Sequence, residues 1–138
     1  MPDHEAIILE RDGPIATIRL NRPDKHNAIN SVMSREMIDA LDVLEADGDV
    51  RVIVLTGAGD KAFCAGGDLK ERRGMTDDAW AAQHAIFERM LRAILACPLP
   101  VIAAAKGLAR NAAVSMRTWW RAQRCRSRAR RRDYPSYS

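Results

Sequence analysis

The sequence predicts an α/β fold, and three features support this. Short apolar runs at residues 6–10, 15–20, 50–56 and 101–105 are typical of β-strands. Between the last three runs, two longer segments carry apolar residues at helical spacing. Turns that contain glycine or proline separate the segments. Strands that alternate with helices in this way indicate βαβ units and a parallel sheet.

The first elements follow from local pattern. The first two runs are joined by RDGP at residues 11–14, which is a good hairpin connection, and the turn-rich segment 21–27 is predicted to be a loop. A helix follows, with Asn30, Ser31 or Ser34 available as its N-cap. One face of this helix collects its large apolar residues, which are Met33, Met37, Ile38, Leu41 and Leu44.

The third run, VRVIVLT at residues 50–56, is apolar nearly throughout, which suits a strand in a sheet covered on both faces. Further along, Thr76 with Asp77 and Asp78 is typical of a helix start. We expect the core-facing side of that helix to hold Trp80, His84, Phe87, Leu91, Ile94 and Leu95. The sequence Pro98-Leu99-Pro100 ends it before the short strand at 101–105.

Charge divides the chain into two unlike parts. Residues 117–138 hold eight of the 22 basic residues and one of the 18 acidic residues, so they carry a formal charge of +7 against −3 for residues 1–116. The sequence pI near 9.3 therefore describes the tail, and it does not indicate a nucleic-acid or membrane partner for the whole chain. Three cysteines without CxxC spacing, no secretory signal and no apolar run long enough for a bilayer predict a reduced, cytoplasmic protein.

A glycine-rich loop follows the third strand, with the sequence GAGDKAFCAGGDL at residues 57–69. Glycines permit close approach of a ligand to the main chain, and a strand-to-helix turn leaves N–H groups free for a developing negative charge. An ordinary glycine-rich turn would look the same in isolation. A phosphate-binding P-loop is excluded, because no Gly-Lys-Ser/Thr follows.

Four motifs occur together, namely RPDKHNA at 22–28, VIVLTG at 52–57, KAFCAGGDL at 61–69 and PVIAAAKG at 100–107. In this order and spacing the chain resembles the enoyl-CoA hydratase/isomerase (crotonase) family. The resemblance covers roughly the first half of a usual member. It implies that residues 1–116 are the N-terminal part of a crotonase-like domain, an incomplete ββα spiral.

The resemblance also implies a site. Pro23, Lys25, Asn27 and Ala28 match the stretch that lines bound coenzyme A. The backbone N–H of Ala65 matches the first donor of the oxyanion hole for the thioester carbonyl, and Gly66, Gly67, Asp68 and Leu69 continue that loop. Ala112 aligns with the second donor, and Ser115 stands where hydratases place a catalytic Glu. No metal is implied, and coenzyme A enters as part of the substrate, so no separate cofactor is expected.

Several polar residues in this region have simpler interpretations. Asp68 suits a cap for the following helix better than a catalytic acid. His26 and His84 lack partners at metal or triad spacing, and Cys64 is predicted to be a small buried residue. Glu71, Arg72 and Arg73 are expected on a solvated helix face, with a lesser prospect of touching coenzyme A phosphates.

The activity implied by the resemblance is hydration of a trans-2-enoyl-CoA in fatty acid metabolism (β-oxidation), by a homotrimer or hexamer. Double-bond isomerisation or another crotonase reaction is the first alternative. A non-catalytic remnant that binds coenzyme A, or that binds nucleic acid through its basic tail, is the second.

The tail at residues 117–138 has eight arginines and no Leu, Ile, Val or Gly. A nucleic-acid-binding arm would explain the arginines and Trp119-Trp120. Out-of-frame translation of a GC-rich gene explains the whole composition better. We therefore expect a truncated family member with a disordered non-family tail and impaired or absent activity.

Overall fold

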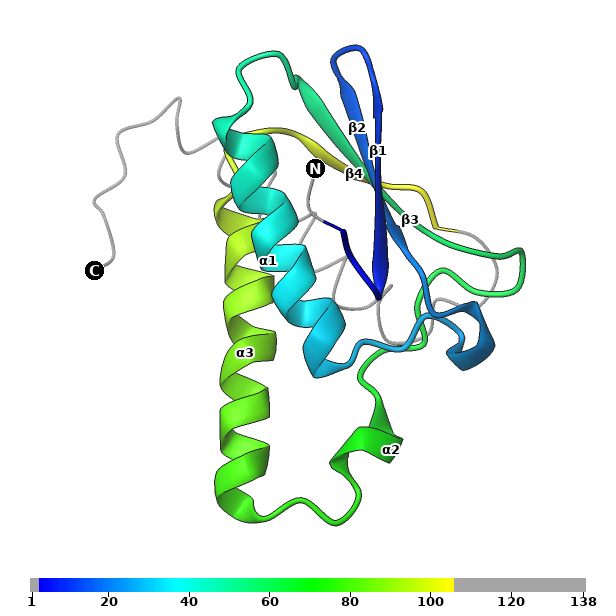
Figure 1. Ribbon diagram of the computed structural model, residues 1–138, viewed down its shortest axis with the longest axis vertical. Coiled ribbons are helices and arrows are strands. Elements are labelled where there is room, and N and C mark those ends of the chain that lie inside the picture. The colour runs from blue at the N-terminus through cyan, green and yellow to red at the C-terminus, as the bar shows by residue number, and fades with distance from the viewer. Residues whose placement is uncertain (1–2, 106–138) are drawn as a thin grey trace, which may run out of the picture.

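The computed structural model describes residues 3–105 (Figure 1). Four strands form one sheet in the order β1-β2-β3-β4, and two long helices pack beside it. The strands are β1 (Ile7–Asp12), β2 (Ile15–Leu20), β3 (Val52–Gly57) and β4 (Val101–Ala103). The helices are α1 (Ser31–Ala46), the single-turn α2 (Leu69–Arg72) and α3 (Asp77–Ala96), and a 3₁₀ turn, η1, spans Pro23–Lys25.

The sheet has the predicted connections. β1 and β2 form an antiparallel hairpin, with Ile7 opposite Leu20. β2 runs parallel to β3 with α1 as the crossover, and β3 runs parallel to β4 with α3 as the crossover. β2 has the predicted bounds, whereas those of the other three strands differ by one or two residues at one or both ends, because pairing with a neighbour and not apolar content decides where a strand ends. β4, for example, stops at Ala103.

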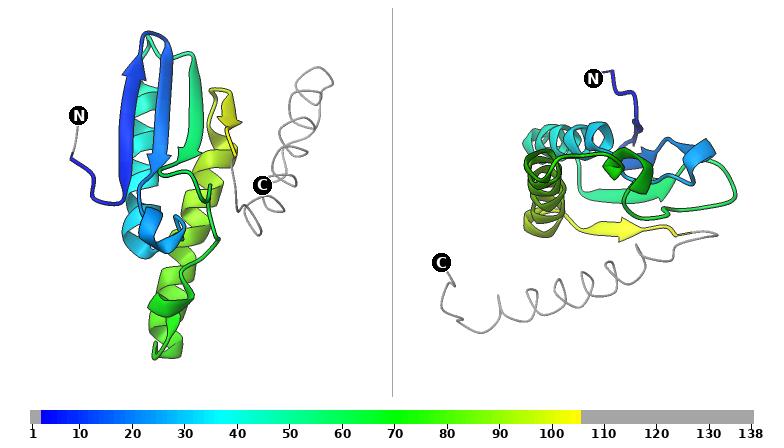
Figure 2. Two further views of the ribbon diagram at one scale, coloured as in Figure 1. Left: turned by 90° about the vertical axis from the view of Figure 1, so that its right-hand side faces the viewer. Right: turned by 90° about the horizontal axis from the view of Figure 1, so that it is seen from below.

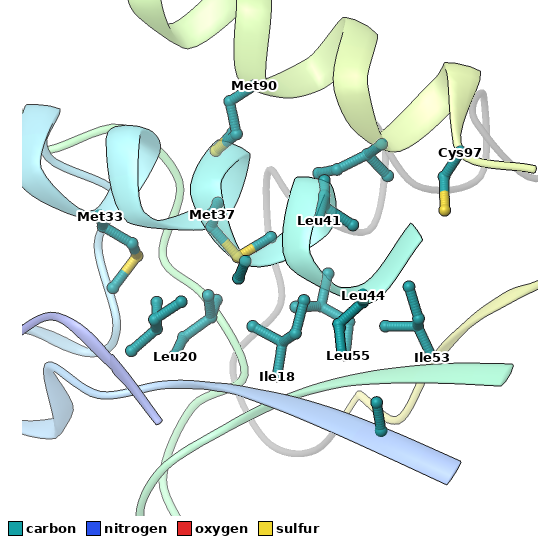
Figure 3. Close-up of a cluster of buried hydrophobic side chains, with 14 of the residues drawn as sticks. Ile18, Leu20, Met33, Met37, Leu41, Leu44, Ile53, Leu55, Met90 and Cys97 are labelled. Carbon is teal, nitrogen blue, oxygen red and sulfur yellow. The ribbon is translucent and has the colours of Figure 1, made fainter. Parts of the chain in front are cut away.

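The core lies between the sheet and α1 and α3, which cover the same face of it (Figures 1 and 2). The predicted α1 face is confirmed, with four of its five residues buried and Ile38 partly buried. Figure 3 shows these side chains meeting Ile18, Leu20, Ile53 and Leu55 of the sheet. Each fully buried side chain of this size contributes about 1.5–3 kcal/mol through loss of its contact with water.

The opposite face of the sheet is open within residues 3–105. Ile15 and Ile102 are exposed on it, and Val52 and Val54 between them are half-buried. The sequence of β3 suits a sheet covered on both faces, and residues 3–105 supply the cover for one of them. The apolar sequence of β3 nevertheless shows that this face is suited to burial.

The prediction for α3 is wrong at two positions. The N-terminal half of α3 extends past the end of the sheet (Figure 1), so Trp80 is 44% exposed and His84 is not in the core. These two rings stack on each other instead, with centroids 4.9 Å apart. The residues of α3 that are buried are Gln83, Met90 and Ile94.

Caps fix the starts of both long helices. Of the three candidate caps for α1, it is Asn30 whose side chain accepts a hydrogen bond from the N–H of Met33. The predicted cap of α3 is confirmed, because Thr76 accepts from the N–H of Ala79. Across residues 3–105 no helix has the length and apolar content needed to cross a bilayer.

Candidate functional site

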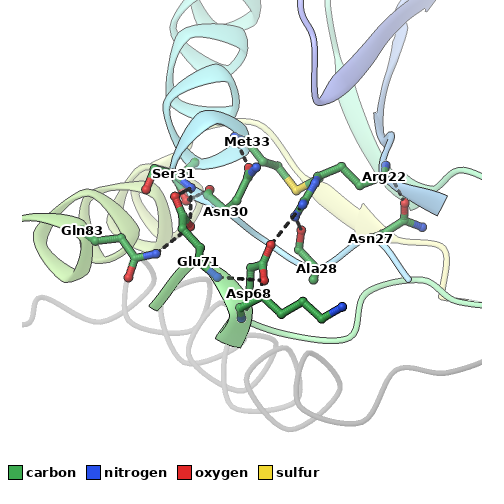
Figure 4. Close-up of polar contacts among 11 residues, drawn as sticks. Arg22, Asn27, Ala28, Asn30, Ser31, Met33, Asp68, Glu71 and Gln83 are labelled. Carbon is green, nitrogen blue, oxygen red and sulfur yellow. Dashed lines mark hydrogen bonds and ion pairs between the residues drawn. The ribbon is translucent and has the colours of Figure 1, made fainter. Parts of the chain in front are cut away.

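Two loops lie side by side at one end of the sheet (Figure 4): residues 21–30, after β2, and residues 58–68, after β3. They join through a parallel bridge between Ile29 and Gly67. Ile29 donates its N–H to the carbonyl of Gly66 at 2.8 Å, and Asp68 donates its N–H to the carbonyl of Ile29 at 2.9 Å. The two glycine- and turn-rich motifs of the sequence therefore form one structural unit.

Asn27 holds the two loops together from inside. Its side chain is fully buried (0% exposed), accepts from the N–H of Arg22 at 2.9 Å and donates to the carbonyls of Ala58 and Ala62 at 3.0 and 2.9 Å. Its backbone, with φ of 56°, is in the left-handed region that non-glycine residues rarely adopt. We expected Asn27 to contact coenzyme A. Its side chain is instead buried and bonded to both loops, so it is not accessible to a ligand.

Asp68 forms a second tie. Its carboxylate accepts from the N–H groups of Lys70 and Glu71, which confirms the predicted cap, and it pairs with the Arg22 guanidinium at 3.0 Å. Arg22 also donates to the carbonyl of Ala28 at 2.7 Å. Burial raises the pKa of Asp68, but the hydrogen bonds from Arg22, Glu71 and Lys70 outweigh it, so the pKa lies below the usual value. Asp68 is thus ionised, and its carboxylate is bonded to Arg22 and to two backbone N–H groups.

The backbone N–H groups of residues 65–68 differ in whether they have an acceptor, and an N–H without one is available to an anion. Ala65 donates to the carbonyl of His26 at 3.0 Å, Gly66 donates to the sulfur of Cys64 at 3.3 Å, and Asp68 is bonded to Ile29. Within residues 3–105 the N–H of Gly67 has no acceptor. The reason is geometric: in a parallel bridge the residues on either side of Gly67 bond to Ile29, so its own N–H points the other way.

This pattern revises the prediction for Ala65. Its N–H is committed to the His26 carbonyl, and among residues 65–68 the N–H without an acceptor in the described part of the chain is that of Gly67. The sequence could not distinguish the two, because the direction of each N–H depends on pairing with Ile29, far away in the chain. Gly67 was part of the predicted loop, but the unbonded state of its N–H within residues 3–105 was not predicted.

Hydrogen bonds between polar side chains join α2 to the start of α1 and to α3. Glu71 accepts from the N–H of Ser31 at 3.1 Å and from the Gln83 amide at 2.7 Å, and the Gln83 oxygen accepts from Nε of Arg72 at 3.2 Å. The predicted solvated face for Glu71 and Arg72 is therefore wrong, and only Arg73 is exposed. Gln83 was missed, although its spacing from Met90 and Ile94 places it on the buried face of α3.

The remaining predicted residues lie around this unit. Pro23 and Lys25 are exposed on η1, Ala28 is half-buried, and Leu69 is 71% exposed beside the loop. Pro23 packs against Gly59, where an added Cβ would lie 3.3 Å from the proline Cβ. Cys64 is buried as predicted, and burial raises the pKa of its thiol. In the described part of the chain no three His, Cys, Asp or Glu side chains are grouped as metal ligands.

Some predictions lie outside the described residues. They are the second donor at Ala112, the position of Ser115, and the boundary between residues 116 and 117 with the tail that follows.

Comparison with known proteins gives the family. The sequence profile of enoyl-CoA hydratase/isomerase matches residues 10–118. The chain belongs to the enoyl-CoA hydratase/isomerase family. Among curated relatives, a short-chain-enoyl-CoA hydratase of Clostridium acetobutylicum is 36% identical over 103 residues, which are 75% of this chain and 40% of that protein. A crotonyl-CoA hydratase of Syntrophomonas wolfei is 35% identical over 106 residues, 77% of this chain and 41% of that protein.

Solved structures agree with the sequence comparison. An enoyl-CoA hydratase/carnithine racemase from Magnetospirillum magneticum matches with a TM-score of 0.73 and 38% identity, over 78% of this chain and 41% of that one. An enoyl-CoA hydratase from Bacillus anthracis matches with a TM-score of 0.72 and 34% identity, over 75% of this chain and 40% of that one. The predicted crotonase-type α/β fold is confirmed, and the chain is a member of an enzyme family.

The matches cover only part of each relative. The chain spans about two-fifths of the length of the curated enoyl-CoA hydratases it matches. The structural matches cover a similar share of their chains. The described loops therefore represent one part of a family site.

Proposed function

We propose that this chain binds an acyl-CoA thioester and that the N–H of Gly67 donates to the thioester carbonyl. The observation that carries the proposal is the Gly67 N–H itself, which has no acceptor within residues 3–105 while its neighbours at 65, 66 and 68 are all bonded. Asn27 and the Arg22–Asp68 pair hold the surrounding backbone in place. A donor that is fixed before the ligand arrives stabilises negative charge on the carbonyl oxygen without reorganisation.

The coenzyme part of the substrate would lie along η1. Pro23 and Lys25 are exposed there, next to Gly59 of the second loop. The Lys25 ammonium suits the phosphate groups of coenzyme A. Coenzyme A is then carried by the substrate, and no further cofactor takes part.

Polarisation of the carbonyl supports more than one reaction. In an enoyl thioester it draws electrons from the double bond, so that the oxygen of a water molecule adds at C3, one proton of that water passes to a base, and a proton is delivered to C2. In an isomerase it stabilises the dienolate formed when a proton leaves. Hydration of a trans-2-enoyl-CoA is the reaction we propose for the family site, with isomerisation as the alternative that needs the same donor.

The general acid and base of a hydratase are not supplied by the carboxylates nearest to Gly67. Asp68 is bonded to Arg22 and to two N–H groups, and Glu71 is bonded to Ser31 and Gln83. We therefore propose that this chain binds thioesters but hydrates them slowly. Assembly into trimers or hexamers, a cytoplasmic location, a role in β-oxidation and Ala112 as the second donor belong to the same proposal.

Two measurements on the purified chain test this. Calorimetric titration should detect binding of crotonyl-CoA that is tighter than binding of free coenzyme A, because only the thioester reaches Gly67. Loss of the enoyl absorbance should be slower than with the Clostridium short-chain-enoyl-CoA hydratase by about 10² or more, because each missing acid or base contributes roughly 10²–10⁴ in rate. Absence of binding would refute the binding proposal, and hydration within tenfold of that enzyme would refute the proposed impairment.

A further inference from the structure

The guanidinium of Arg72 lies against the Cα of Gly67. A Cβ added to Gly67 would be 3.1 Å from Nη2 of Arg72 and 3.5 Å from its Cζ. The space that any other residue at position 67 would fill is therefore occupied by a positive charge. That charge lies beside the residue whose N–H is free within residues 3–105.

Arg72 is held in this position from one side only. Its Nε donates to the Gln83 oxygen at 3.2 Å, and Gln83 is 8% exposed. The orientation of the Gln83 amide is fixed because its nitrogen donates to Glu71 at 2.7 Å. Among residues 3–105 neither Nη atom of Arg72 has a hydrogen-bond partner, so both are available to an anion.

The charge of Arg72 is also not neutralised by the described residues. Four arginines pair with carboxylates, namely Arg11, Arg19, Arg22 and Arg92. Five described arginines have no carboxylate partner in this part of the chain. Four of these are exposed, namely Arg35, Arg51, Arg73 and Arg89. Arg72 alone among the described arginines is half-buried and lacks a carboxylate partner. A side chain that interacted only with solvent would be neither hydrogen-bonded to Gln83 nor packed against Gly67, as Arg72 is.

We propose that Arg72 is an electrostatic positioning residue that favours the anionic, enolate form of the thioester at the Gly67 N–H over its neutral form. The inference rests on the proposed function, since it concerns the same donor. The physical reason is that a fixed positive charge a few ångströms away, in a half-buried setting, interacts strongly with an anion and weakly with a neutral carbonyl. Binding of a neutral acyl group should therefore depend little on Arg72.

Acetoacetyl-CoA and butyryl-CoA separate these two effects. When acetoacetyl-CoA enolises, its C2 proton passes to a buffer base, the electron pair of the C–H bond forms a carbon–carbon double bond, and the π pair of the carbonyl moves onto its oxygen. The enolate absorbs in the ultraviolet, so its bound fraction can be measured at each pH. Butyryl-CoA has the same coenzyme and a neutral acyl group, and it reports binding alone.

The variants are Arg72→Met, Arg72→Lys and the matched control Arg73→Met, which removes the same charge from the exposed neighbour. For Arg72→Met we expect a loss of about tenfold in the bound enolate fraction, with butyryl-CoA affinity within about twofold of the parent chain. Arg72→Lys should lose less, because the charge remains but the Gln83 anchor is lost. Arg73→Met should match the parent chain in both measurements.

Gly67→Ala provides an independent variant that keeps both the N–H and the charge. Its Cβ must displace the guanidinium by a few tenths of an ångström, so the enolate fraction should fall in the parent chain and fall less in the Arg72→Met background. If Arg72→Met proves poorly folded by circular dichroism, Arg72→Lys and the single Gly67→Ala variant still test the inference, because each should lower the bound enolate fraction and leave butyryl-CoA affinity within about twofold of the parent chain.

The outcomes are distinct. An unchanged enolate fraction in Arg72→Met, or an equal loss in Arg73→Met, overturns the inference and leaves the proposed function intact. Equal losses for butyryl-CoA and acetoacetyl-CoA would assign Arg72 to the coenzyme phosphates and also overturn it. If the parent chain binds neither thioester, the proposed function fails and the inference fails with it.

Discussion

Arg22 and Asp68 form an ion pair that joins the two loops of the site, with Nη2 of Arg22 3.0 Å from Oδ2 of Asp68. The same carboxylate caps α2, and the same guanidinium holds the Ala28 carbonyl. The pair therefore links the loop that we propose for coenzyme A with the loop that carries Gly67, whose N–H has no acceptor among residues 3–105. Both side chains are largely buried, at 19% and 13% exposure.

Asp68→Asn should lower the free energy of unfolding at pH 7 by about 1–3 kcal/mol, because the charge partner of a largely buried Arg22 is lost while the cap oxygen remains. Denaturation by urea measures this. Asp24→Asn is the matched control, since Asp24 is exposed on η1 and has no ion-pair partner in the described part of the chain. A loss no larger than in this control would show that the pair does not stabilise the loops.

The same pair predicts a pH dependence. The pKa of Asp68 in the folded chain is below its ordinary value of 3.8, so its contribution to stability is present above 3.8 and is lost as the pH falls through the folded value. The parent chain should therefore lose more stability than Asp68→Asn when the pH is lowered from 5 to about 3. Equal slopes for the two chains over this range would contradict the assignment.

Asn27→Ala should cost about 2–4 kcal/mol, because it leaves the Arg22 N–H and the Ala58 and Ala62 carbonyls without their buried partner. Asn27→Gly should cost about 1 kcal/mol less, since glycine adopts the left-handed backbone without strain. His26→Gly is the control: His26 has φ of 52° but an exposed side chain, so its change should stay within about 1 kcal/mol. If thermal or urea unfolding shows that His26→Gly is less stable than Asn27→Ala, the role of the Asn27 amide is refuted.

Gly57→Ala should destabilise the chain by about 1–3 kcal/mol or more through overpacking. The added Cβ would lie 2.5 Å from the carbonyl oxygen of Phe63 and 2.7 Å from Nδ2 of Asn27, and neither atom is free to move. Gly48→Ala makes the same chemical change in open space and should stay within about 0.5 kcal/mol of the parent chain. Similar unfolding midpoints for the two variants would contradict the close packing between β3 and the loop that follows it.

The open face of the sheet predicts self-association. Ile15 and Ile102 are exposed there beside Val52 and Val54, and an apolar surface of this kind promotes contact between chains. Replacing Ile15 and Ile102 together by Thr should shift sedimentation toward smaller species at micromolar concentration. Val43→Thr, at an exposed apolar position on α1, should leave the distribution unchanged. A double variant that associates as strongly as the parent chain would exclude this face as the contact.

Local pattern predicted much of the fold. The alternating runs gave the hairpin and the parallel strands, and the apolar face of α1 was correct because a helix that crosses a sheet must bury one stripe. Trp80 and His84 were misplaced because helical periodicity does not tell where the sheet beneath a helix ends. The prediction for β3 had a similar limit, since apolar sequence shows that a face is suited to burial but not which segment covers it.

The site was less accessible to sequence reasoning. Its two loops were predicted, and so was the cap at Asp68. The donor that we propose was not predicted, because the N–H of Gly67 is left without an acceptor within residues 3–105 by the bridge to Ile29, a contact between distant segments. The Arg22–Asp68 and Arg72–Gln83 contacts are likewise long-range, and nothing in the local sequence distinguishes these arginines from Arg73.

The most direct test of the central claim is the amide spectrum of the ¹⁵N-labelled chain titrated with crotonyl-CoA and, separately, with free coenzyme A. The Gly67 amide proton should move strongly downfield with crotonyl-CoA and little with coenzyme A, because only the thioester supplies an oxygen to it. The amides of Ala65, Gly66 and Asp68 should keep their internal hydrogen bonds and shift less. A dominant shift at Ala65, with Gly67 unmoved at saturation, would contradict the assignment of the donor.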